Sequence, residues 1–501
     1  LARAADRHRP VLHRRTAEGE RVDEVEFHPS YRALQAAARE HRVFTASWHP
    51  LEGHERVPRT LGFALGYLYA QAECGYYCPA CMTDGAAFVL TRHAPPALRD
   101  ALVPRLLQLS PEGAYEGAMY LTEKGGGSDV GGGTETRAEQ ASDGTWRLMG
   151  EKWFASNCVA DVALALARMP DGAAGTAGLG LFVVPRRLPN GTPNPGLRIE
   201  RLKEKLGVTS MPTGEVLLEG AVAHLVAPAP AGFRAMAEMV NLSRLYNAVA
   251  SVALARRALR EGVRAATHRE AFGRRLADQP LFLRALTALA LEVEGALGVT
   301  LDTAAVFDRY AAGDAEAGRL LRVLTPCAKA MTAKLAVRAA SEACEMLGGV
   351  GYIEEYVTPR LLRDAQVLPI WEGTTNVQLL EFLRALEKGG VEAFAAHVRP
   401  HVDPAPFLQE AARLATLNRD ARELAAPRLM HLCYHLHAQA TLRAAAPHAT
   451  DPARAERVAA LYGAVALATD TAAAEQALGT AVLAKEGGLP LMLSGLSGLP
   501  S

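Results

Sequence analysis

The amino-acid sequence predicts a mainly helical protein with a small β-domain in its middle. Three successive stretches of the chain, each with its own pattern, support this fold class. Residues 31–108 show apolar side chains at helical spacing, residues 115–226 break into short alternating runs, and helical spacing returns beyond Pro230. This order of elements does not make a dinucleotide-binding fold, and no G-x-G-x-x-G motif follows a strand and opens a helix.

Length, charge and cysteine content narrow the class of protein. A chain of 501 residues is long enough for several domains, and its 54 Lys and Arg balance 54 Asp and Glu, so no global field favours nucleic acid, membranes or acidic ligands. Seven thinly spread cysteines favour a reducing compartment. No apolar run approaches the ~20 residues of a membrane helix. We therefore expect a soluble, cytoplasmic protein that has no membrane partner.

The basic N-terminus is not followed by an apolar signal core, and the chain begins at Leu1. We expect at least an initiator methionine to precede it. Cys74, Cys78 and Cys81 are close enough in sequence to suggest metal ligands, but no nearby His or Cys pair completes a tetrahedral set. We expect them to be small thiols that face the core, and we expect no metal site.

The first half of the chain divides into two predicted domains. Residues 1–114 form an N-terminal helical domain, with an apolar face that includes Leu61, Leu65 and Leu68. Residues 115–228 form the middle β-domain, because short alternating runs such as TWRLMGEKWFA and LGLFVVP are separated by turn residues. The pair Asp143–Gly144 marks a hairpin, and the whole indicates a small antiparallel β-barrel.

The second half is predicted to be helical throughout. Residues 229–388 carry long amphipathic stripes, such as Leu286, Leu289, Val293 and Leu297, which indicate a four-helix bundle. One helix of the bundle ends at Gly348–Gly349. Residues 389–501 carry further stripes and are predicted to be an appended C-terminal helical domain, whose tail frays after Gly487.

A glycine-rich loop, LTEKGGGSDVGGG at residues 121–133, follows the first predicted strand of the β-domain. Its backbone N–H groups can approach an anion closely, and Thr122 and Ser128 add hydroxyl donors. It could hold a pyrophosphate or a ring carbonyl. Taken alone, such a loop is more often a flexible hairpin turn.

Two further blocks suggest ligand contacts. In GEKWFASN (residues 150–157) the aromatic side chains could flank a planar ligand while Ser156 bonds its edge, although core packing explains Trp153 equally well. In REAFGRRLADQP (residues 269–280) Arg269 and Phe272 are predicted to lie one helical turn apart. Together they could take a phosphate and a purine, or they could decorate a surface.

The block RDAQVLPIWEGTTN (residues 363–376) places Glu372 between the apolar pair Ile370 and Trp371, which favour burial, and turn residues that can cap a helix near Val377. We expect this carboxylate to be partly desolvated. Desolvation raises a carboxyl pKa toward neutrality, as a general base requires. A local cap or ion pair is the alternative for Glu372 in isolation.

Together these blocks resemble the acyl-CoA dehydrogenase family of flavoproteins, and more closely its AidB-like, alkylation-response branch. The resemblance covers nearly the whole chain through EVEFHPSYRAL, ECGYYCPACMT, YLTEKGGGSDV, GEKWFASN, RLKEKLG, REAFG, EMLGGVGY and PIWEGTTN. It implies a helical domain, a β-barrel, a four-helix bundle and an appended helical domain, assembled as a homotetramer. It also implies FAD as cofactor at the subunit interface and an acyl-CoA thioester as substrate.

The resemblance carries individual roles onto matching positions. Glu372 matches the catalytic base; the helix that holds the base in other members is represented here by residues 241–245, which contain no carboxylate. Ser128 and Arg244 are the expected substrate contacts. The expected FAD contacts are Met119, Leu121, Thr122, Gly127, Ser128, Phe154, Ala155, Ser156, Arg269, Phe272, Gln279, Glu345, Gly349, Ile370, Trp371, Thr374 and Asn376, of which Arg269, Phe272 and Gln279 would come from a neighbouring subunit.

Three positions depart from most of the family and agree with its AidB-like branch: Lys124 in place of proline, and Glu345 and Asn376 in place of glutamine. They argue against ordinary fatty-acid oxidation. The leading function is α,β-dehydrogenation of a short or branched acyl-CoA, with an electron acceptor that the sequence does not identify. The rival is a flavoprotein that binds double-stranded DNA in the alkylation-damage response and has vestigial dehydrogenase activity. An inert scaffold tetramer ranks third, because the flavin blocks are intact.

DNA binding in this branch is attributed to the last helical domain. Residues 381–501 hold eleven Lys and Arg against twelve Asp and Glu, so the segment is not basic overall. Arg413, Arg419, Arg422 and Arg428 are spaced so that some could share a face and give weak, non-specific binding. The favoured alternative is that they pair with Glu410, Asp420 and Glu423 within helical reach.

Overall fold

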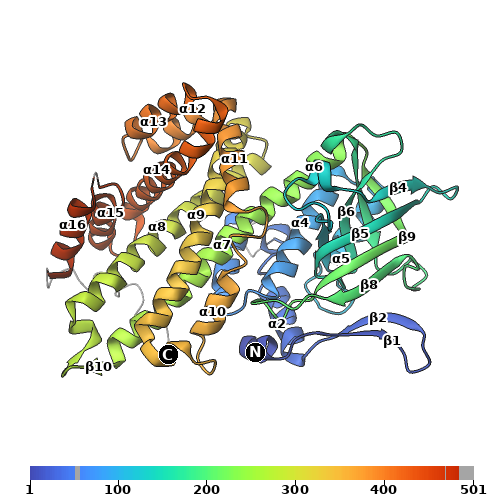
Figure 1. Ribbon diagram of the computed structural model, residues 1–501, viewed down its shortest axis with the longest axis horizontal. Coiled ribbons are helices and arrows are strands. Elements are labelled where there is room, and N and C mark those ends of the chain that lie inside the picture. The colour runs from blue at the N-terminus through green and yellow to red at the C-terminus, as the bar shows by residue number, and fades with distance from the viewer. Residues whose placement is uncertain (51–56, 469, 484–501) are drawn as a thin grey trace. The chain divides into compact units, whose positions relative to one another are not determined.

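The computed structural model describes residues 1–50, 57–468 and 470–483 (Figure 1). The chain divides into two compact units, Leu1–Tyr246 and Asn247–Ser501. The boundary lies inside the long helix α7 (Ala231–His268). The mainly helical class with a middle β-domain is confirmed, whereas the division into four domains stays a prediction.

The first unit begins with predominantly helical structure, as predicted. Its helices before the barrel are α1 (Ala2–Arg7), α2 (Pro29–Glu40), the 3₁₀ turn η1 (Ala46–Trp48), α3 (Arg59–Ala70), α4 (Tyr77–His93) and α5 (Pro96–Leu106). Proline opens α2 and α5 because its missing N–H costs nothing at a first helical position. Cys74 and Cys81 are buried and Cys78 is half-buried beside them.

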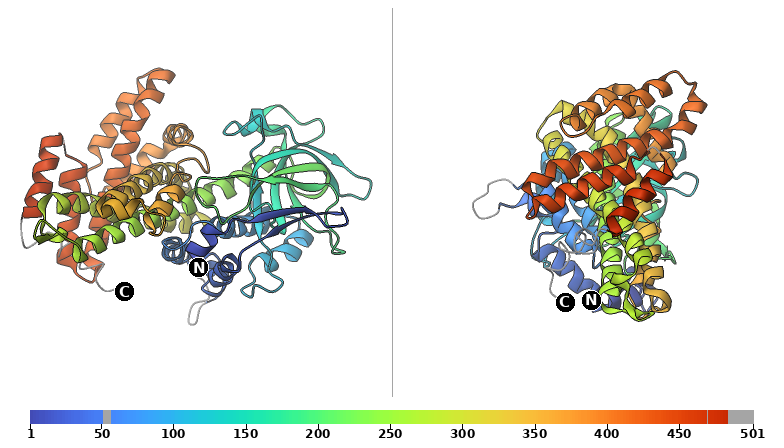
Figure 2. Two further views of the ribbon diagram at one scale, coloured as in Figure 1. Left: turned by 60° about the horizontal axis from the view of Figure 1, so that its bottom comes forward. Right: turned by 90° about the vertical axis from the view of Figure 1, so that its left-hand side faces the viewer.

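The middle of the first unit is a closed barrel, seen from the side in the left view of Figure 2. The strands are β3 (Gly117–Tyr120), β4 (Arg137–Gln140), β5 (Trp146–Ser156), β6 (Val162–Arg168), β7 (Leu179–Pro185), β8 (Leu197–Leu202) and β9 (Thr213–Ala227), with the short turns α6 (Val130–Gly133) and η2 (Gly175–Gly178) between them. The circuit runs β6–β4–β5–β9–β7 and returns to β6, while β3 adds to β6 and β8 to β9.

The predicted barrel is confirmed, but its pairing is not wholly antiparallel. Strand β3 runs parallel to β6, with Gly117 opposite Val162, and β4 meets β6 in parallel at one residue pair. Parallel pairing is possible here because a long crossover separates β3 from β6 in the chain. The predicted hairpin at Asp143–Gly144 does join β4 to β5, with Gly144 at φ +79°.

Strand β6 explains why the run VALALA, residues 162–167, is apolar at every position. Ala163, Ala165 and Ala167 face the barrel interior with Tyr120 and Phe182. Leu164 and Leu166 face outward and pack against helix α4 through residues such as Val89. Both faces of the strand are therefore buried, which removes the polar alternation of a half-exposed strand.

The second unit is predominantly helical. After the end of α7 it contains β10 (Glu270–Ala271), β11 (Arg274–Arg275), η3 (Leu276–Asp278), α8 (Pro280–Ala311), α9 (Ala315–Leu347), η4 (Gly348–Tyr352), α10 (Thr358–Ala365), α11 (Thr375–Ala385), the irregular turn η5 (Leu386–Gly390), α12 (Val391–Val398), α13 (Ala405–Ala415), α14 (Arg419–Ala445), η6 (Ala446–His448), α15 (Pro452–Ala466) and α16 (Thr471–Leu483).

The predicted bundle consists of the later half of α7 together with α8, α9 and α11 (Figure 1). Helix α9 packs against both α8 and α11. At Gly262 on α7 an added Cβ would lie 2.7 Å from Met346 Sδ on α9, so glycine permits a close approach of these two helices. The bundle leads into the appended helices through a kink at Gly389, which has φ +83°.

The appended helices rest on α8 at two glycines. A Cβ at Gly295 would lie 2.5 Å from the Tyr462 ring on α15, and one at Gly298 would lie 2.5 Å from Thr441 Oγ1 on α14. The predicted helical extension is therefore seated directly on a bundle helix. Within the described residues, none of the helices combines the length and the apolar character needed to span a bilayer.

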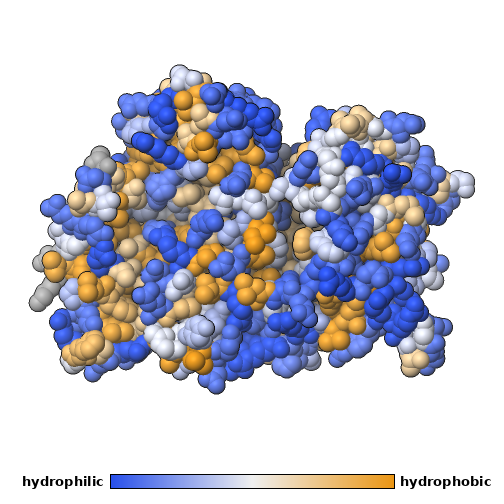
Figure 3. Space-filling view, in the orientation of Figure 1, coloured by the Kyte–Doolittle hydropathy of each residue, from blue (hydrophilic) through white to orange (hydrophobic). Residues whose placement is uncertain are grey.

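Apolar side chains also reach the surface of the second unit. Figure 3 shows hydrophobic residues exposed over its long helices. Large exposed apolar side chains of this unit include Phe272, Tyr352, Ile353 and Tyr356. Exposed apolar surface of this kind is typical of an interaction surface rather than of a face that stays in water.

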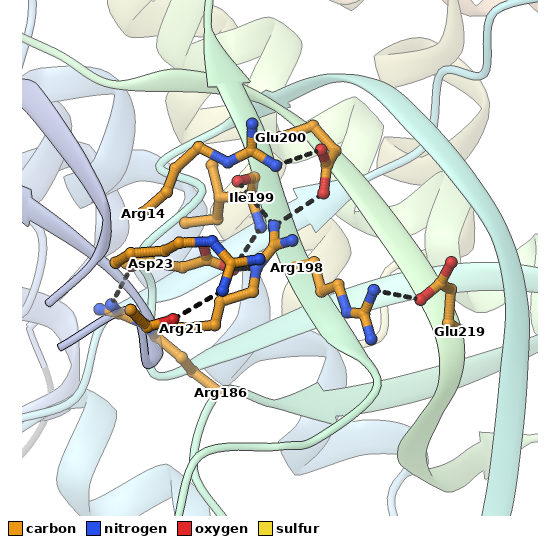
Figure 4. A network of polar contacts seen from close by, with 10 residues as sticks. Arg14, Arg21, Asp23, Arg186, Arg198, Ile199, Glu200 and Glu219 are labelled. Atoms are coloured by element: carbon orange, nitrogen blue, oxygen red, sulfur yellow. Dashed lines mark hydrogen bonds and ion pairs between the residues drawn. The ribbon is translucent and has the colours of Figure 1, made fainter.

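The N-terminal segment contains a β-hairpin that the sequence pattern did not predict. Strands β1 (Val11–Arg15) and β2 (Arg21–Glu26) are mostly exposed, so they lack the apolar alternation that would mark them. Figure 4 shows the polar contacts that hold the hairpin to strand β8. Arg14 and Arg21 each lie 2.7 Å from a Glu200 carboxylate oxygen, and the Ile199 N–H donates to Asp23 Oδ2 at 3.1 Å. Charge pairing thus holds this hairpin to β8, together with Leu12, which packs against the barrel core.

Candidate active site

The glycine-rich loop is anchored by a buried glutamate. Glu123, 6% exposed, accepts hydrogen bonds from the backbone N–H groups of Glu135 (2.7 Å) and Thr136 (3.1 Å) and from the Thr136 hydroxyl (2.6 Å). A small bridge between Glu123 and Gly126 closes the first turn of the loop. The loop is therefore fixed at its start, which argues against a merely flexible turn.

A buried lysine completes this anchor. Lys152 Nζ on β5 donates to Glu123 Oε1 at 2.6 Å and to the Leu166 carbonyl at 2.9 Å, and the side chain is fully buried. Burial lowers the pKa of Lys152, because desolvation disfavours the ammonium form, while the Glu123 charge opposes that shift. This ion pair joins two of the sequence blocks, and the block-by-block reasoning did not predict it.

The residues after Lys152 leave an aromatic surface beside the loop. Phe154 is 55% exposed, and Trp153 is half-buried; the backbone N–H of Trp153 donates to the Thr122 carbonyl at 2.9 Å. Lys203 Nζ lies 3.4 Å from the centroid of the Trp153 ring. An exposed aromatic ring beside a fixed loop with free hydroxyl groups can receive a planar ligand.

The other expected ligand contacts of this unit differ from one another in exposure. Gly127 and Ser128 are exposed at the loop tip, and Met119, Leu121, Thr122 and Ser156 are half-buried around it. The Ala155 side chain is fully buried in the barrel core, so only its backbone can reach a ligand. On α7, Arg244 donates to Asn241 Oδ1 at 3.1 Å.

In the second unit, Glu372 lies on a tight turn with an unusual backbone. Its φ is +60°, and that of Gly373 is +97°. A non-glycine residue in the left-handed region is uncommon and must be held by its surroundings. Lys329, fully buried on α9, donates to the Gly373 carbonyl at 2.6 Å. Gln378 Nε2 on α11 donates to the Glu372 carbonyl at 2.9 Å and to that of Gly373 at 3.1 Å.

These contacts fix the backbone on which a half-buried carboxylate stands. The expected burial of Ile370 is wrong in the single chain: this residue is 62% exposed, because it lies in the turns between α10 and α11 rather than on a packed helix or strand. Trp371 is half-buried. The helix that follows begins at Thr375, two residues earlier than predicted, with Thr374 as N-cap but without a side-chain capping bond. Asn376 is exposed in its first turn.

The prediction that Arg269 and Phe272 share a helical face is wrong. Helix α7 ends at His268, and the next residues form a hairpin with Glu270 opposite Arg275. Phe272 (φ +54°) and Gly273 (φ +72°) make its two-residue turn, so the ring stands at the tip and is 97% exposed. Two successive positive φ angles suit a tight hairpin and break a helix.

Arg269 instead forms a hydrogen bond at the C-terminal end of another helix, α9. Its guanidinium donates to the Leu347 carbonyl, at the C-terminus of α9, where a cation is favourable. Gln279 Nε2 donates to the Ala271 carbonyl at 2.9 Å and so braces the hairpin. Glu345 and Gly349, also expected ligand contacts, are exposed beside that same helix end.

The four arginines considered for DNA all have carboxylate partners. Arg413 makes two bonds to Glu410, at 2.8 and 2.7 Å, and Arg428 lies 3.7 Å from the same carboxylate. Arg419 pairs with Glu423 at 3.0 Å, whereas Arg422 pairs with Glu387 at 2.7 Å rather than with Asp420. The expectation that these arginines pair with carboxylates is thus confirmed. Glu410 and Glu423 are partners as expected, whereas Glu387 takes the place of Asp420.

Reasoning from the sequence missed the supporting residues Glu123, Lys152, Lys329 and Gln378. A signal was present for Lys152: a lysine inside a strand, next to residues that alternate in burial, needs a buried partner. Lys329 lies within an otherwise apolar helix stripe and carries the same signal. Neither signal identifies the partner.

Three family models match the chain in succession. They are the adaptive response protein AidB N-terminal domain at residues 1–110, the acyl-CoA dehydrogenase middle domain at residues 118–221, and the acyl-CoA dehydrogenase C-terminal domain at residues 231–387. The matched order agrees with the observed order of helices, barrel and bundle.

Individual relatives agree with these models. AidB of Escherichia coli (strain K12) is 38% identical over 77% of this chain and 71% of its own length. Acyl-CoA dehydrogenase family member 11 of Caenorhabditis elegans is 38% identical over 77% of this chain, which spans 63% of that relative. The crystal structure of Caenorhabditis elegans ACDH-11 in complex with C11-CoA matches with a TM-score of 0.85 at 29% identity, over 99% of this chain and 88% of that one. This chain therefore belongs to the acyl-CoA dehydrogenase family of FAD-dependent oxidoreductases, in its AidB-like branch.

Proposed function

We propose that this protein removes one hydrogen from each of the α and β carbons of a short or branched acyl-CoA thioester, with Glu372 as the base. The observation that carries the proposal is the turn at Glu372. Its backbone is held in a left-handed conformation by bonds from Lys329 and Gln378 to the adjoining carbonyls. A strained, externally held position for a carboxylate is typical of a functional site.

The described residues fit a bound flavin. Phe154 presents an exposed ring beside the anchored glycine loop, and exposed apolar side chains of this size favour a planar partner. Next to Glu372, the Gln378 Oε1 atom is buried and has no partner among the described residues. An unsatisfied buried acceptor marks a place where a donor from a ligand or water belongs.

The expected contacts from the glycine loop, from β5 and from the Glu372 turn would hold FAD, and Ser128 and Arg244 would contact the substrate. When bound, FAD supplies the acceptor for the hydride that leaves Cβ. Glu372 takes the proton from Cα and becomes a carboxylic acid, and the electron pair of that C–H bond forms the Cα=Cβ double bond. Lys329 and Gln378 position Glu372 through its backbone.

The acyl group of the proposed substrate is short or branched. A short or branched chain follows from the AidB-like branch, whereas the ACDH-11 structure was solved with C11-CoA. The cytoplasmic location stays a prediction, and the sequence identifies no electron acceptor. A homotetramer is also proposed, since Tyr352, Ile353 and Tyr356 expose apolar surface that a second copy could cover.

Non-specific binding to double-stranded DNA is the second candidate function. Arg419 and Arg428 favour it, because their side chains are 87% and 80% exposed despite their carboxylate partners. The Arg419–Glu423 pair is exposed and contributes little, so Arg419 can exchange its carboxylate for a phosphate at small cost. Arg428 lies 3.7 Å from Glu410, and that buried carboxylate keeps Arg413 as its nearer partner. The segment has no excess of positive charge, so the proposed binding is weak and depends steeply on salt.

The test of the leading function is flavin bleaching. The purified full chain is reconstituted with FAD, its flavin content per chain is measured, and the flavin absorbance is followed anaerobically with short, branched and medium acyl-CoA thioesters. We expect one FAD per chain and bleaching by at least one thioester. A protein that cannot take up FAD contradicts the flavin assignment, and a loaded protein that no thioester bleaches favours the binding function.

A further inference from the structure

A cluster of metal-ligating side chains lies in the second unit, on three helices. None of these helices carries Glu372. Asp302 on α8, His397 on α12 and His437 on α14 bring their ligand atoms within 4.8 Å of one another. Both histidines present Nε2, and each Nε2 lies 2.7 Å from the same atom, Asp302 Oδ2. Three helices thus converge on one carboxylate oxygen.

His437 lies on the buried side of this cluster, whereas His397 and Asp302 are partly exposed to solvent. The His437 side chain is 2% exposed, while His397 and Asp302 are 20% and 29% exposed. The two imidazole rings meet edge to face with centroids 5.5 Å apart, and the His437 ring also contacts the edge of Phe394. A ring packed in this way keeps its orientation, and the open side leaves room for water ligands.

The chemistry of the three groups suits a divalent transition metal. Imidazole nitrogen and carboxylate oxygen are ordinary ligands of Zn²⁺, at about 2.0–2.2 Å, and around a tetrahedral ion such ligands lie about 3.3 Å apart. The observed separations of 2.7 Å need to open by roughly half an ångström, within the reach of small side-chain rotations. Neutral histidines with a single carboxylate leave a net positive site when the ion is bound, and no further charged partner is required.

We propose that Asp302, His397 and His437 form a binding site for one Zn²⁺ ion, with water at the remaining positions. The ligands come from a bundle helix and from two appended helices that lie 95 and 135 residues further along the chain. Binding of the ion therefore fastens the appended helices to α8, next to the glycine contacts that already seat them. Its role is structural and is independent of the flavin chemistry.

Without an ion the same groups can form two hydrogen bonds from imidazole N–H to Asp302, and the experiment must separate the two states. The full-length protein, loaded with FAD, is stripped with a chelator and equilibrated by dialysis against buffered Zn²⁺. We expect one retained Zn²⁺ per chain at micromolar free metal. We also expect a higher melting temperature with Zn²⁺ than without it.

The variants are chosen to fold without the ion. Asp302→Asn keeps the size of the side chain and a carbonyl acceptor but removes the charge, and His437→Gln keeps a polar group at the buried position. Both should lose Zn²⁺ retention and its effect on melting while keeping their FAD. His448→Ala, at an exposed turn beyond the same helix, is the matched control and should retain one Zn²⁺.

Three results would overturn the assignment. The first is no retained Zn²⁺ in the wild type at micromolar free metal, which leaves only the hydrogen-bonded cluster. The second is retention that survives both Asp302→Asn and His437→Gln. The third is bound Zn²⁺ that leaves the melting temperature unchanged, because an ion that joins three helices must stabilise the folded chain.

Discussion

Lys152 Nζ donates to Glu123 Oε1 at 2.6 Å, and both side chains are buried in the barrel. One residue comes from the glycine-rich loop and the other from the strand that carries Phe154. The pair therefore ties together the two segments of the first unit that are proposed to hold the flavin. A buried pair is costly to break, since the partner left behind keeps its charge without compensation.

Replacement of Lys152 by Met should destabilise the protein by about 3–5 kcal/mol, because Glu123 is left as a lone buried carboxylate. The glycine-rich loop should become more mobile once Lys152 no longer holds Glu123, and FAD retention should fall. Urea unfolding and flavin absorbance after gel filtration measure the two effects. The double variant with Glu123→Gln should recover part of the stability, and Lys388→Met, at an exposed lysine outside the barrel, should change neither.

Replacement of Glu372 by Gln should keep the flavin and abolish its bleaching. The amide is nearly isosteric but cannot accept the α-proton, so the reduction rate should fall by about 10²-fold or more. Stopped-flow absorbance with the best acyl-CoA measures this rate. Glu392→Gln, on an exposed helix position, is the control. Undiminished bleaching by the Glu372→Gln variant would remove Glu372 from the mechanism.

Replacement of Gln378 by Leu tests whether this residue positions Glu372. The change removes two hydrogen bonds to the turn, each of about 1 kcal/mol, so kcat per bound FAD should fall by about tenfold while KM stays near the wild type. A role in overall stability alone would lower the melting temperature without this selective loss of kcat. Steady-state kinetics and a thermal melt distinguish the two.

The pH dependence of stability contains a term from Asp161. Burial raises the pKa of this carboxyl above its usual value, and the nearby Glu116 charge adds to the rise. The folded state therefore holds a proton that the unfolded state has released, and stability falls as pH rises from about 3.8 through the folded pKa. At pH 7 the folded protein has to bury the charged Asp161 carboxylate, which lowers its stability.

Replacement of Asp161 by Asn should therefore stabilise the protein at pH 7. The amide oxygen can still accept the Glu116 N–H, which lies 2.8 Å from Asp161 Oδ2. The gain should shrink as the pH approaches 3.8, where the wild-type carboxyl is protonated as well. Urea unfolding of both proteins across this range measures the difference, and a gain that is constant with pH would contradict the ionisation argument.

DNA binding should be weak, free of sequence preference and steeply salt-dependent. The double variant Arg419→Ala, Arg422→Ala should weaken it, whereas Glu372→Gln should leave it unchanged. Gel shifts with duplexes of unrelated sequence, at low and at moderate salt, make the comparison. Tight binding that persists at high salt, or the absence of any shift at low salt, would count against the proposal.

The sequence alone determined the class of fold and the family. Helical and strand periodicities report local burial, so the change from helices to strands near residue 115 and back near residue 230 is visible without coordinates. The blocks LTEKGGGSDV, GEKWFASN and PIWEGTTN identify the family when they are taken together and in this order. Glu372 could be singled out in this way because it stands inside the block PIWEGTTN, whereas Lys329, which holds its turn, lies on a distant helix.

Tertiary structure alone decided which distant residues meet. Glu123 finds Lys152 only when the barrel closes, and His397 and His437 meet Asp302 only when the appended helices dock on α8. The same holds where local reasoning failed: Phe272 is at a hairpin tip because a bond closes the chain from Leu276 to Arg269. Contacts of this kind depend on loop closure and packing over many residues, and spacing along the sequence carries no record of them.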